Sequence, residues 1–364
     1  MKILFCAGGT FGHIAPALAA AEALKKQKPN AEILFAGREN GAEAEIIQKA
    51  GFLFYGIPMQ SVTRKLSMQA LEALITTAKA CGRAKALLKQ LRPDAVFGTG
   101  GYVCYPFLRA AQKMKIPTLL HESNATPGRA CRMLAPGCDA ILLGMHACAN
   151  YLPQNIHCFY TGNPVREDFL RYSREKARRI LGLSSDDIFL LSFGGSGGAK
   201  CLNDAIFSFM ARRDQGASFY HVHAAGKKYY EEAAARYPAF TKKSGKKRIY
   251  PFIENMPLYM YAADLCICRS GAMTIAELAA AQLPAILVPS PNVTENHQYK
   301  NARCLSDAGG AALLEEGELW RLEDLTQEIL SDKARLLAMR EALAPCASPK
   351  AADRIVDKIL SFLP

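Results

Sequence analysis

Three clusters of closely spaced glycines are the first candidates for chemistry in this sequence. Gly8, Gly9 and Gly12 form the first, residues 98–101 the second and residues 194–198 the third. Each cluster ends a short apolar run that is typical of a strand, and the carboxyl ends of parallel strands face the ligand crevice of an open sheet. Glycine lets backbone N–H groups approach a phosphate or a sugar closely, and the N-terminus of the next helix adds a partial positive charge. The clusters therefore predict a site for a ligand that carries phosphate or sugar.

Neither of the common nucleotide-binding signatures fits these clusters. In the third cluster Lys200 is followed by Cys201, and the glycine spacing of a phosphate-binding P-loop is missing. In the first cluster Thr10 and Phe11 stand where a dinucleotide fingerprint places its spaced glycines. The sequence therefore argues against a kinase, an ATPase and a dehydrogenase.

A fourth loop, residues 268–277, connects an apolar run directly to a helical pattern. Ser270 is the expected N-cap of that helix. The helix N-terminus can hold a diphosphate, and Glu277 can accept hydrogen bonds from a ribose diol if its side chain faces the crevice. The alternative for Glu277 is a solvated helix residue with no ligand.

The elements that must position these loops alternate between apolar runs and helical patterns, as in βαβ units with a parallel sheet. The first helix is expected at residues 15–26. A turn-prone run near residue 163 separates two sets of five strands. We expect two doubly wound α/β domains, residues 1–163 and 164–340, and a helical segment at 341–364 that packs back toward the first domain. The expected strands are KILFCAGG, AEILFAG, DAVFGTGG, IPTLLHES and AILLG, then IFLLSFGG, SFYHVHAAG, KRIYPFI, ADLCICRS and PAILVPS.

Composition places the chain among globular proteins. Of its 364 residues 50% are apolar and 21% are charged, which excludes a disordered, collagenous or small disulfide-stapled protein. The twelve cysteines lack the spacing of a zinc or redox motif, so we interpret them as small apolar side chains in a reducing cytoplasm. The opening apolar stretch, residues 3–7, stops at Gly8, so no signal peptide is expected. No apolar run approaches the roughly 20 residues that span a bilayer, so any membrane contact should be peripheral.

Positive charge is concentrated in the first half of the chain. The formal charge is +12 overall, and residues 1–163 hold 18 Lys and Arg against 9 Asp and Glu. Such asymmetry indicates an anionic partner, either nucleic acid, an acidic membrane or a phosphorylated substrate, unless it is an ordinary solubilising surface.

Residues 61–92 carry much of this charge. They include seven basic residues and one acidic residue, Glu72, interleaved with apolar side chains. The segment suits an anionic bilayer surface, and a solvated helix pair is the alternative. No RNA-binding motif accompanies the charge, which disfavours a nucleic-acid partner.

Seven motifs occur in order between residue 7 and about residue 302: AGGTFGHIAPALA, GTGGYVCYP, HESN, TGNPVRED, FGGSGGAK, CRSGAMTIAE and ENHQYKNA. Together they resemble the ordered motif set of the MurG family. Enzymes of that family transfer N-acetylglucosamine from UDP-N-acetylglucosamine to undecaprenyl-diphosphate-MurNAc-pentapeptide, lipid I, and so make lipid II for peptidoglycan. The resemblance implies a GT-B architecture of two facing Rossmann-like domains, an inverting hexosyltransferase without a cofactor, and a peripheral place on the cytoplasmic face of the cell membrane.

By motif position the resemblance implies two groups of substrate-binding residues. Phe11 stands where the family usually has a small residue, and its ring would narrow the acceptor side. The acceptor-facing motifs contain His13, Tyr102 and Glu122. The donor contacts would be Thr10, Phe11, Gly12 and Asn124 at the sugar, Arg166 and Ser196 at the diphosphate, Ile253 at uracil, Ala272, Met273, Thr274 and Glu277 at ribose and phosphate, and Gln298 at the sugar hydroxyls.

Inverting transfer needs a base for the acceptor hydroxyl and a group that stabilises the departing diphosphate. His13 is the preferred base because the positive end of a helix dipole favours neutral imidazole. Glu122 is the rival base, and otherwise it orients Asn124 or the acceptor. The sequence has no Asp-x-Asp triplet, so we expect no tightly held metal, and Arg166 with loop N–H groups balances the diphosphate charge.

Two other functions stay open at this point. A UDP-N-acetylglucosamine 2-epimerase would share the two-domain layout and the donor. A sugar-nucleotide sensor without catalysis would bind the donor alone.

Overall fold

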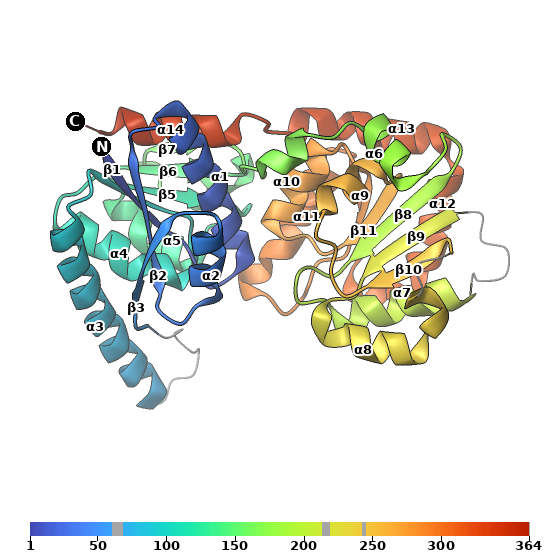
Figure 1. Ribbon diagram of the computed structural model, residues 1–364, viewed down its shortest axis with the longest axis horizontal. Coiled ribbons are helices and arrows are strands. Elements are labelled where there is room, and N and C mark those ends of the chain that lie inside the picture. Colours follow the sequence, from blue (N-terminus) through green and yellow to red (C-terminus); the bar gives the residue numbers. More distant parts are fainter. Residues whose placement is uncertain (60–67, 213–218, 242–244, 364) are drawn as a thin grey trace. The chain divides into compact units, whose positions relative to one another are not determined.

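The computed structural model describes residues 1–59, 68–212, 219–241 and 245–363, and these form two compact units (Figure 1). Unit 1 comprises Met1–Arg166 and Ser348–Pro364, and unit 2 comprises Glu167–Ala347. The domain boundaries expected from the sequence fall a few residues before these divisions.

Unit 1 is built on a seven-stranded sheet with the order β3-β2-β1-β4-β5-β6-β7, and every pair in it is parallel. The order reverses beside β1, between β1 and β4. In an open α/β sheet the loops that leave the strands at such a switch point form the ligand crevice. The strands are β1 (Lys2–Cys6), β2 (Glu32–Arg38), β3 (Leu53–Ile57), β4 (Ala95–Gly98), β5 (Thr118–Glu122), β6 (Ala140–Leu143) and β7 (Cys158–Tyr160).

Helices cover both faces of this sheet, and an apolar cluster fills each interface (Figure 1). One interface is built around Phe5, whose ring lies 5.3 Å from that of Phe35 and 5.4 Å from that of Phe97. The C-terminal helix joins this interface through Ile355 and Val356, which are fully buried beside the first helix. The helices of unit 1 are α1 (Phe11–Gln27), α2 (Ala42–Lys49), α3 (Met68–Leu91), α4 (Gly101–Lys113), α5 (Arg129–Leu134) and α14 (Ala351–Ser361).

Helix α1 begins four residues before the expected residue 15. Thr10 is extended, with φ −146° and ψ 157°, and the helix starts directly after it. The first turn therefore contains Gly12 and His13 as well as Phe11. The earlier start brings the glycine loop and the helix N-terminus together.

Helix α3 carries most of the described part of the basic segment. Arg64, Lys65 and the apolar Leu66 lie outside the described residues, whereas Lys79 and Arg83 lie exposed on α3. Among the helices of the described ranges, none combines the length and the apolar character that crossing a bilayer requires.

Unit 2 has the same type of fold, built on a six-stranded parallel sheet with the order β10-β9-β8-β11-β12-β13. Its switch point lies between β8 and β11. The strands are β8 (Ile188–Phe193), β9 (Phe219–Ala224), β10 (Lys247–Tyr250), β11 (Leu265–Cys268), β12 (Ala285–Leu287) and β13 (Ala311–Leu313). The main helices are α6 (Arg174–Leu181), α7 (Lys200–Arg212), α8 (Lys227–Arg236), α9 (Met256–Ala262), α10 (Ala272–Ala280), α11 (His297–Ser306), α12 (Leu322–Ser331) and α13 (Lys333–Leu343).

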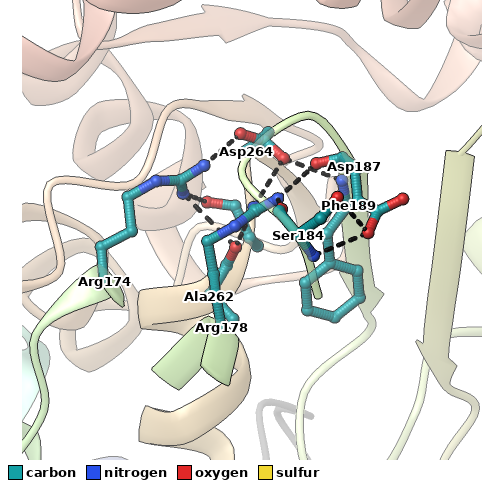
Figure 2. Close-up of polar contacts among 8 residues, drawn as sticks. Arg174, Arg178, Ser184, Asp187, Phe189, Ala262 and Asp264 are labelled. Carbon is teal, nitrogen blue, oxygen red and sulfur yellow. Dashed lines mark hydrogen bonds and ion pairs between the residues drawn. The ribbon is translucent and has the colours of Figure 1, made fainter. Parts of the chain in front are cut away.

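An ion-pair network holds the amino ends of β8 and β11 (Figure 2). Asp264, directly before β11, pairs with Arg174 and with Arg178, and its Oδ2 also accepts a 2.8 Å hydrogen bond from the Phe189 N–H. Arg178 in turn donates to backbone carbonyls of Ser184 and Asp187. The network lies at the strand ends opposite to the ligand loops, so it supports the fold and not the site.

Candidate active site and donor-binding loops

The loops after β1 and β4 in unit 1 are joined by two hydrogen bonds. Nδ1 of His13 lies 2.9 Å from the Thr99 carbonyl oxygen, and the Thr99 hydroxyl donates to the His13 carbonyl oxygen at 2.6 Å. Because β1 and β4 are neighbours, the two loops emerge side by side at the switch point. The His13 ring is therefore held in one orientation beside the second glycine cluster.

The second glycine cluster contacts the His13 imidazole at positions that require glycine. Gly100 and Gly101 have φ of 90° and 75°, in the left-handed region that side chains disfavour. A Cβ on Gly101 would stand 2.9 Å from Cδ2 and 3.2 Å from Nε2 of His13. The second glycine cluster thus makes room for the His13 ring.

Glu122 at the end of β5 has both carboxylate oxygens engaged. Oε1 accepts from the backbone N–H of Asn124 at 3.0 Å and from its side-chain Nδ2 at 2.9 Å, and Oε2 accepts from the Gly128 N–H at 2.9 Å. The side chain is buried. These bonds fix the loop between β5 and α5 and aim the Asn124 amide.

Four further residues of the expected site, Thr10, Phe11, Gly12 and Tyr102, lie at the same edge of the sheet. Thr10, Phe11 and Gly12 are exposed at the start of α1, and the Phe11 side chain retains 44% of its accessible surface. Tyr102 is half-buried, with its ring against Gly9. The structure thus gathers Thr10, Phe11, Gly12, His13 and Tyr102 around the loops of β1 and β4.

In unit 2 the loop after β11 is tied to the segment that contains Gln298. The expected cap of α10 is wrong: Gly271 is the N-cap, and the Ser270 hydroxyl donates instead to the Gln298 carbonyl oxygen at 2.8 Å. The Gln298 side-chain Oε1 accepts from the Ser290 N–H at 2.9 Å. Asn301 donates to the Ser270 carbonyl oxygen at 3.2 Å. Sequence reasoning missed Ser290 and Asn301, because their roles depend on which loops meet.

The expected ligand residues of α10 differ in how far they are buried. Ala272 and Met273 are buried, whereas Thr274 and Glu277 are half-buried. Ile253, after β10, is also buried. Partial exposure favours Thr274 and Glu277 over their neighbours for contacts that side chains make with a ligand, whereas Ala272 and Met273 lie in the first turn of α10, where backbone N–H groups are available.

The two residues expected at the diphosphate lie in different units. Ser196 is exposed in the glycine loop after β8, beside Gly195 with φ 91°. Arg166 is half-buried at the end of the first segment of unit 1. Within the described ranges, no group of three or more His, Cys, Asp or Glu is placed to hold a metal ion.

Comparison with known proteins identifies the family to which this chain belongs. A glycosyltransferase family 28 N-terminal domain matches residues 3–143, and a glycosyltransferase family 28 C-terminal domain matches residues 189–355. The UDP-N-acetylglucosamine--N-acetylmuramyl-(pentapeptide) pyrophosphoryl-undecaprenol N-acetylglucosamine transferase of Acetivibrio thermocellus is 38% identical over 100% of this chain and 98% of that protein. The enzyme of the same name from Desulforudis audaxviator is 40% identical over 99% of this chain and 98% of that protein.

Solved structures agree with the sequence relatives. The crystal structure of Acinetobacter baumannii MurG is similar with a TM-score of 0.79 and 29% identity, covering 99% of both chains. A UDP-GlcNAc 2-epimerase from Neisseria meningitidis reaches a TM-score of 0.71 over 99% of this chain and 100% of that one, but at 13% identity this likeness extends to the fold alone. The identity to transferases along both units decides between the two, and the chain belongs to the MurG family of glycosyltransferases.

Proposed function

We propose that this protein transfers N-acetylglucosamine from UDP-N-acetylglucosamine to the MurNAc 4-hydroxyl of undecaprenyl-diphosphate-MurNAc-pentapeptide, converting lipid I into lipid II with inversion at the sugar carbon. One observation carries the proposal: relatives named for this transfer are 38–40% identical along nearly the whole of both chains. The product serves peptidoglycan synthesis.

His13 is the proposed general base. With Nδ1 engaged by the Thr99 carbonyl, the other ring nitrogen accepts the proton of the acceptor hydroxyl. The hydroxyl oxygen attacks the anomeric carbon of the donor, the bond from that carbon to the diphosphate breaks, and UDP departs. Glu122 is proposed to position Asn124 and not to accept the proton, because three N–H groups already occupy its oxygens.

Donor binding is assigned to residues of both units. Arg166 and Ser196 are proposed to stabilise the leaving diphosphate, since charge that develops on a leaving group is balanced best by fixed donors. Glu277 would accept from the ribose diol and Gln298 would meet the sugar hydroxyls. The proposed donor set is completed by Thr10, Phe11, Gly12, Asn124, Ile253, Ala272, Met273 and Thr274, with Tyr102 on the acceptor side.

Transfer of labelled N-acetylglucosamine to a lipid I analogue tests the proposal directly. The expected product is a labelled disaccharide lipid, with none formed on a polyprenyl-phosphate sugar that lacks the muramyl peptide. Incubation with the donor alone tests the rival reaction. Formation of UDP-ManNAc without an acceptor would identify an epimerase and contradict the proposal.

The proposed place of action is the cytoplasmic face of the cell membrane, where the protein binds peripherally. An acceptor with a long polyprenyl tail stays in the bilayer, and each Lys or Arg near an anionic surface contributes about 1 kcal/mol to binding. Liposome sedimentation should therefore rise with anionic lipid content and fall with salt. Binding should also drop when Arg64, Lys65, Lys79 and Arg83 become Glu, and salt-independent binding would contradict the proposal.

A further inference from the structure

Unit 1 contains a cavity at the same edge of the sheet as the glycine loops. A cavity of about 280 Å³ opens where β2 and β3 end and where α3 passes them. Its lining includes Arg38, Glu39 and Asn40 from the end of β2, Met59 after β3, and Lys79 and Arg83 from α3. None of these residues belongs to the site assigned to the base or the donor, whereas Lys79 and Arg83 are also among the four residues proposed to attract the membrane.

Positive side chains outnumber negative ones in the described lining of the cavity. Three cations, Arg38, Lys79 and Arg83, face one carboxylate, Glu39. Lys79 and Arg83 are four residues apart on α3, so they lie on one face of the helix. Among the described residues none of the three cations forms an ion pair, and Nε of Arg38 is buried without a hydrogen-bond acceptor. A buried guanidinium donor without an acceptor is unfavourable, so the cavity is suited to receive an anion.

The position of the cavity limits what that anion can be. All strands of the sheet are parallel, so the ends of β2 and β3 lie at the same edge as the loop after β1 that carries His13. Neighbouring strands are about 4.8 Å apart, which places the cavity roughly 5–10 Å along that edge from β1. The muramyl peptide is attached next to the reacting hydroxyl, and an extended pentapeptide reaches about 17 Å. The cavity is therefore within reach of the acceptor peptide.

The chemistry of the lining favours a peptide over a bilayer surface. Glu39 repels phosphate but can accept from an ammonium or amide group, and the Asn40 amide can both donate and accept. A concave site with a half-buried arginine, such as Arg38, fits a discrete carboxylate better than it fits a planar layer of headgroups. We infer that this cavity binds the pentapeptide of the lipid-linked acceptor, with Arg38, Lys79 and Arg83 holding its carboxylates. The inference rests on the proposed function, because it assumes a muramyl-pentapeptide acceptor.

The kinetic test compares acceptors with and without the peptide. Arg38→Gln and Arg83→Gln are measured with a short-chain lipid I analogue in detergent, without vesicles, so that membrane attraction does not contribute. Both should raise KM for the pentapeptide acceptor about tenfold, with kcat and the donor KM nearly unchanged, since a lost charged contact weakens binding by about that factor. An analogue whose muramyl carboxyl group is a simple amide should show no change. Lys85→Gln and Lys89→Gln, exposed on the same helix but outside the cavity lining, are the matched controls.

Direct binding separates this inference from the proposed function. Calorimetry with water-soluble N-acetylmuramyl-pentapeptide needs no transfer reaction. Binding by the wild type that weakens in Arg38→Gln but not in Lys85→Gln supports the peptide site even if no sugar is transferred. Equal KM changes for both acceptors, unchanged binding in Arg38→Gln, or a loss confined to anionic-vesicle sedimentation would overturn it.

Discussion

Nδ1 of His13 lies 2.9 Å from the carbonyl oxygen of Thr99. A carbonyl oxygen only accepts hydrogen bonds, so Nδ1 carries the proton and Nε2 of the neutral ring carries the lone pair. In this tautomer Nε2 is the ring nitrogen through which the proposed base would act.

Replacing His13 should therefore remove proton transfer and spare donor binding. We expect His13→Gln to lower kcat by about 10² to 10⁴, the range typical of a lost general base. The dissociation constant for UDP-N-acetylglucosamine, measured by calorimetry, should change little. Glu122→Gln is the comparison, and a larger loss of kcat there with the fold intact would instead make Glu122 the base.

The fit between His13 and Gly101 gives a second prediction. Gly101→Ala would place a methyl group 2.9 Å from Cδ2 of His13 at a φ of 75°, so the ring must move. A displacement of about 1 Å at a reacting group costs on the order of 10² in rate. We expect kcat to fall by about that factor.

Gly51→Ala is the matched control for backbone strain. Gly51 has a similar φ of 83°, but apart from its chain neighbours no residue lies within 4 Å of the place that its new methyl group would take. Both substitutions should destabilise the fold by about 1 kcal/mol or more, as measured by urea unfolding, whereas only Gly101→Ala should lower kcat. Equal kcat in the two variants would contradict the proposed place of the His13 ring.

Gln298 can be tested without disturbing its neighbour. Its Oε1 accepts from the Ser290 N–H at 2.9 Å, which Gln298→Glu preserves while the Nε2 donor is removed. If that donor reads the sugar hydroxyls, Gln298→Glu should reduce discrimination between UDP-N-acetylglucosamine and UDP-N-acetylgalactosamine by about tenfold, measured as the ratio of kcat/KM values. Gln298→Ala loses both interactions. Retained discrimination in both variants would remove Gln298 from sugar recognition.

The sequence predicted ten of the strands, because most of these are apolar runs with buried side chains and several of them end in glycine. It missed β3, β7 and β13. Leu53 in β3 is 62% exposed, and β7 and β13 have three residues each, so their apolar pattern is weak. The glycine loops were predictable because their composition is local. The contacts of Thr99 with His13, and of Ser290 with Gln298, were not, because they depend on which strands become neighbours.

The Asp264 network should be needed for stability but not for catalysis. Asp264→Ala would leave Arg174 and the buried Arg178 without their carboxylate. The loss of Asp264 would also destabilise the charged form of Arg340. Burial, and then the charge of Arg174, lower the pKa of the Arg340 guanidinium to about 10, and the charge of Asp264 opposes this effect. Removing one partner of a buried pair costs about 3–5 kcal/mol, and Asp264 is partly exposed, so we expect about 3 kcal/mol in urea unfolding.

An exposed pair provides the control for this effect. Asp204 lies 3.1 Å from Lys200 on the surface of α7, and pairs of this kind contribute about 0.5 kcal/mol or less. Asp204→Ala should therefore have little effect on unfolding. A loss as small for Asp264→Ala would show that the network does not hold β8 and β11 together.

Both units should lose stability in acid because they bury neutral histidines. Burial lowers the pKa of His121 in unit 1 to about 4 and that of His223 in unit 2 to about 3. The Ser192 hydroxyl lies 2.8 Å from Nδ1 of His223 and 2.8 Å from Nε2 of His221, and burial lowers the pKa of His221 as well. An unfolded histidine has a pKa of about 6.5. Below pH 6.5 the unfolded chain therefore binds more protons than the folded chain, and the free energy of unfolding falls. The fall continues toward pH 4 for His121 and toward pH 3 for His223. Above pH 6.5 these histidines do not change the free energy of unfolding.

Urea unfolding at pH 7.5, 6.0 and 5.0 measures this dependence. Each pH unit below 6.5 should remove about 1.4 kcal/mol for every such histidine. His223→Gln keeps a hydrogen-bonding side chain but cannot titrate, so its free energy of unfolding should fall less steeply in acid than that of the wild type. The same pH dependence in both proteins would mean that His223 is not held neutral in the folded core, because replacing a residue that takes up a proton only on unfolding must reduce the slope.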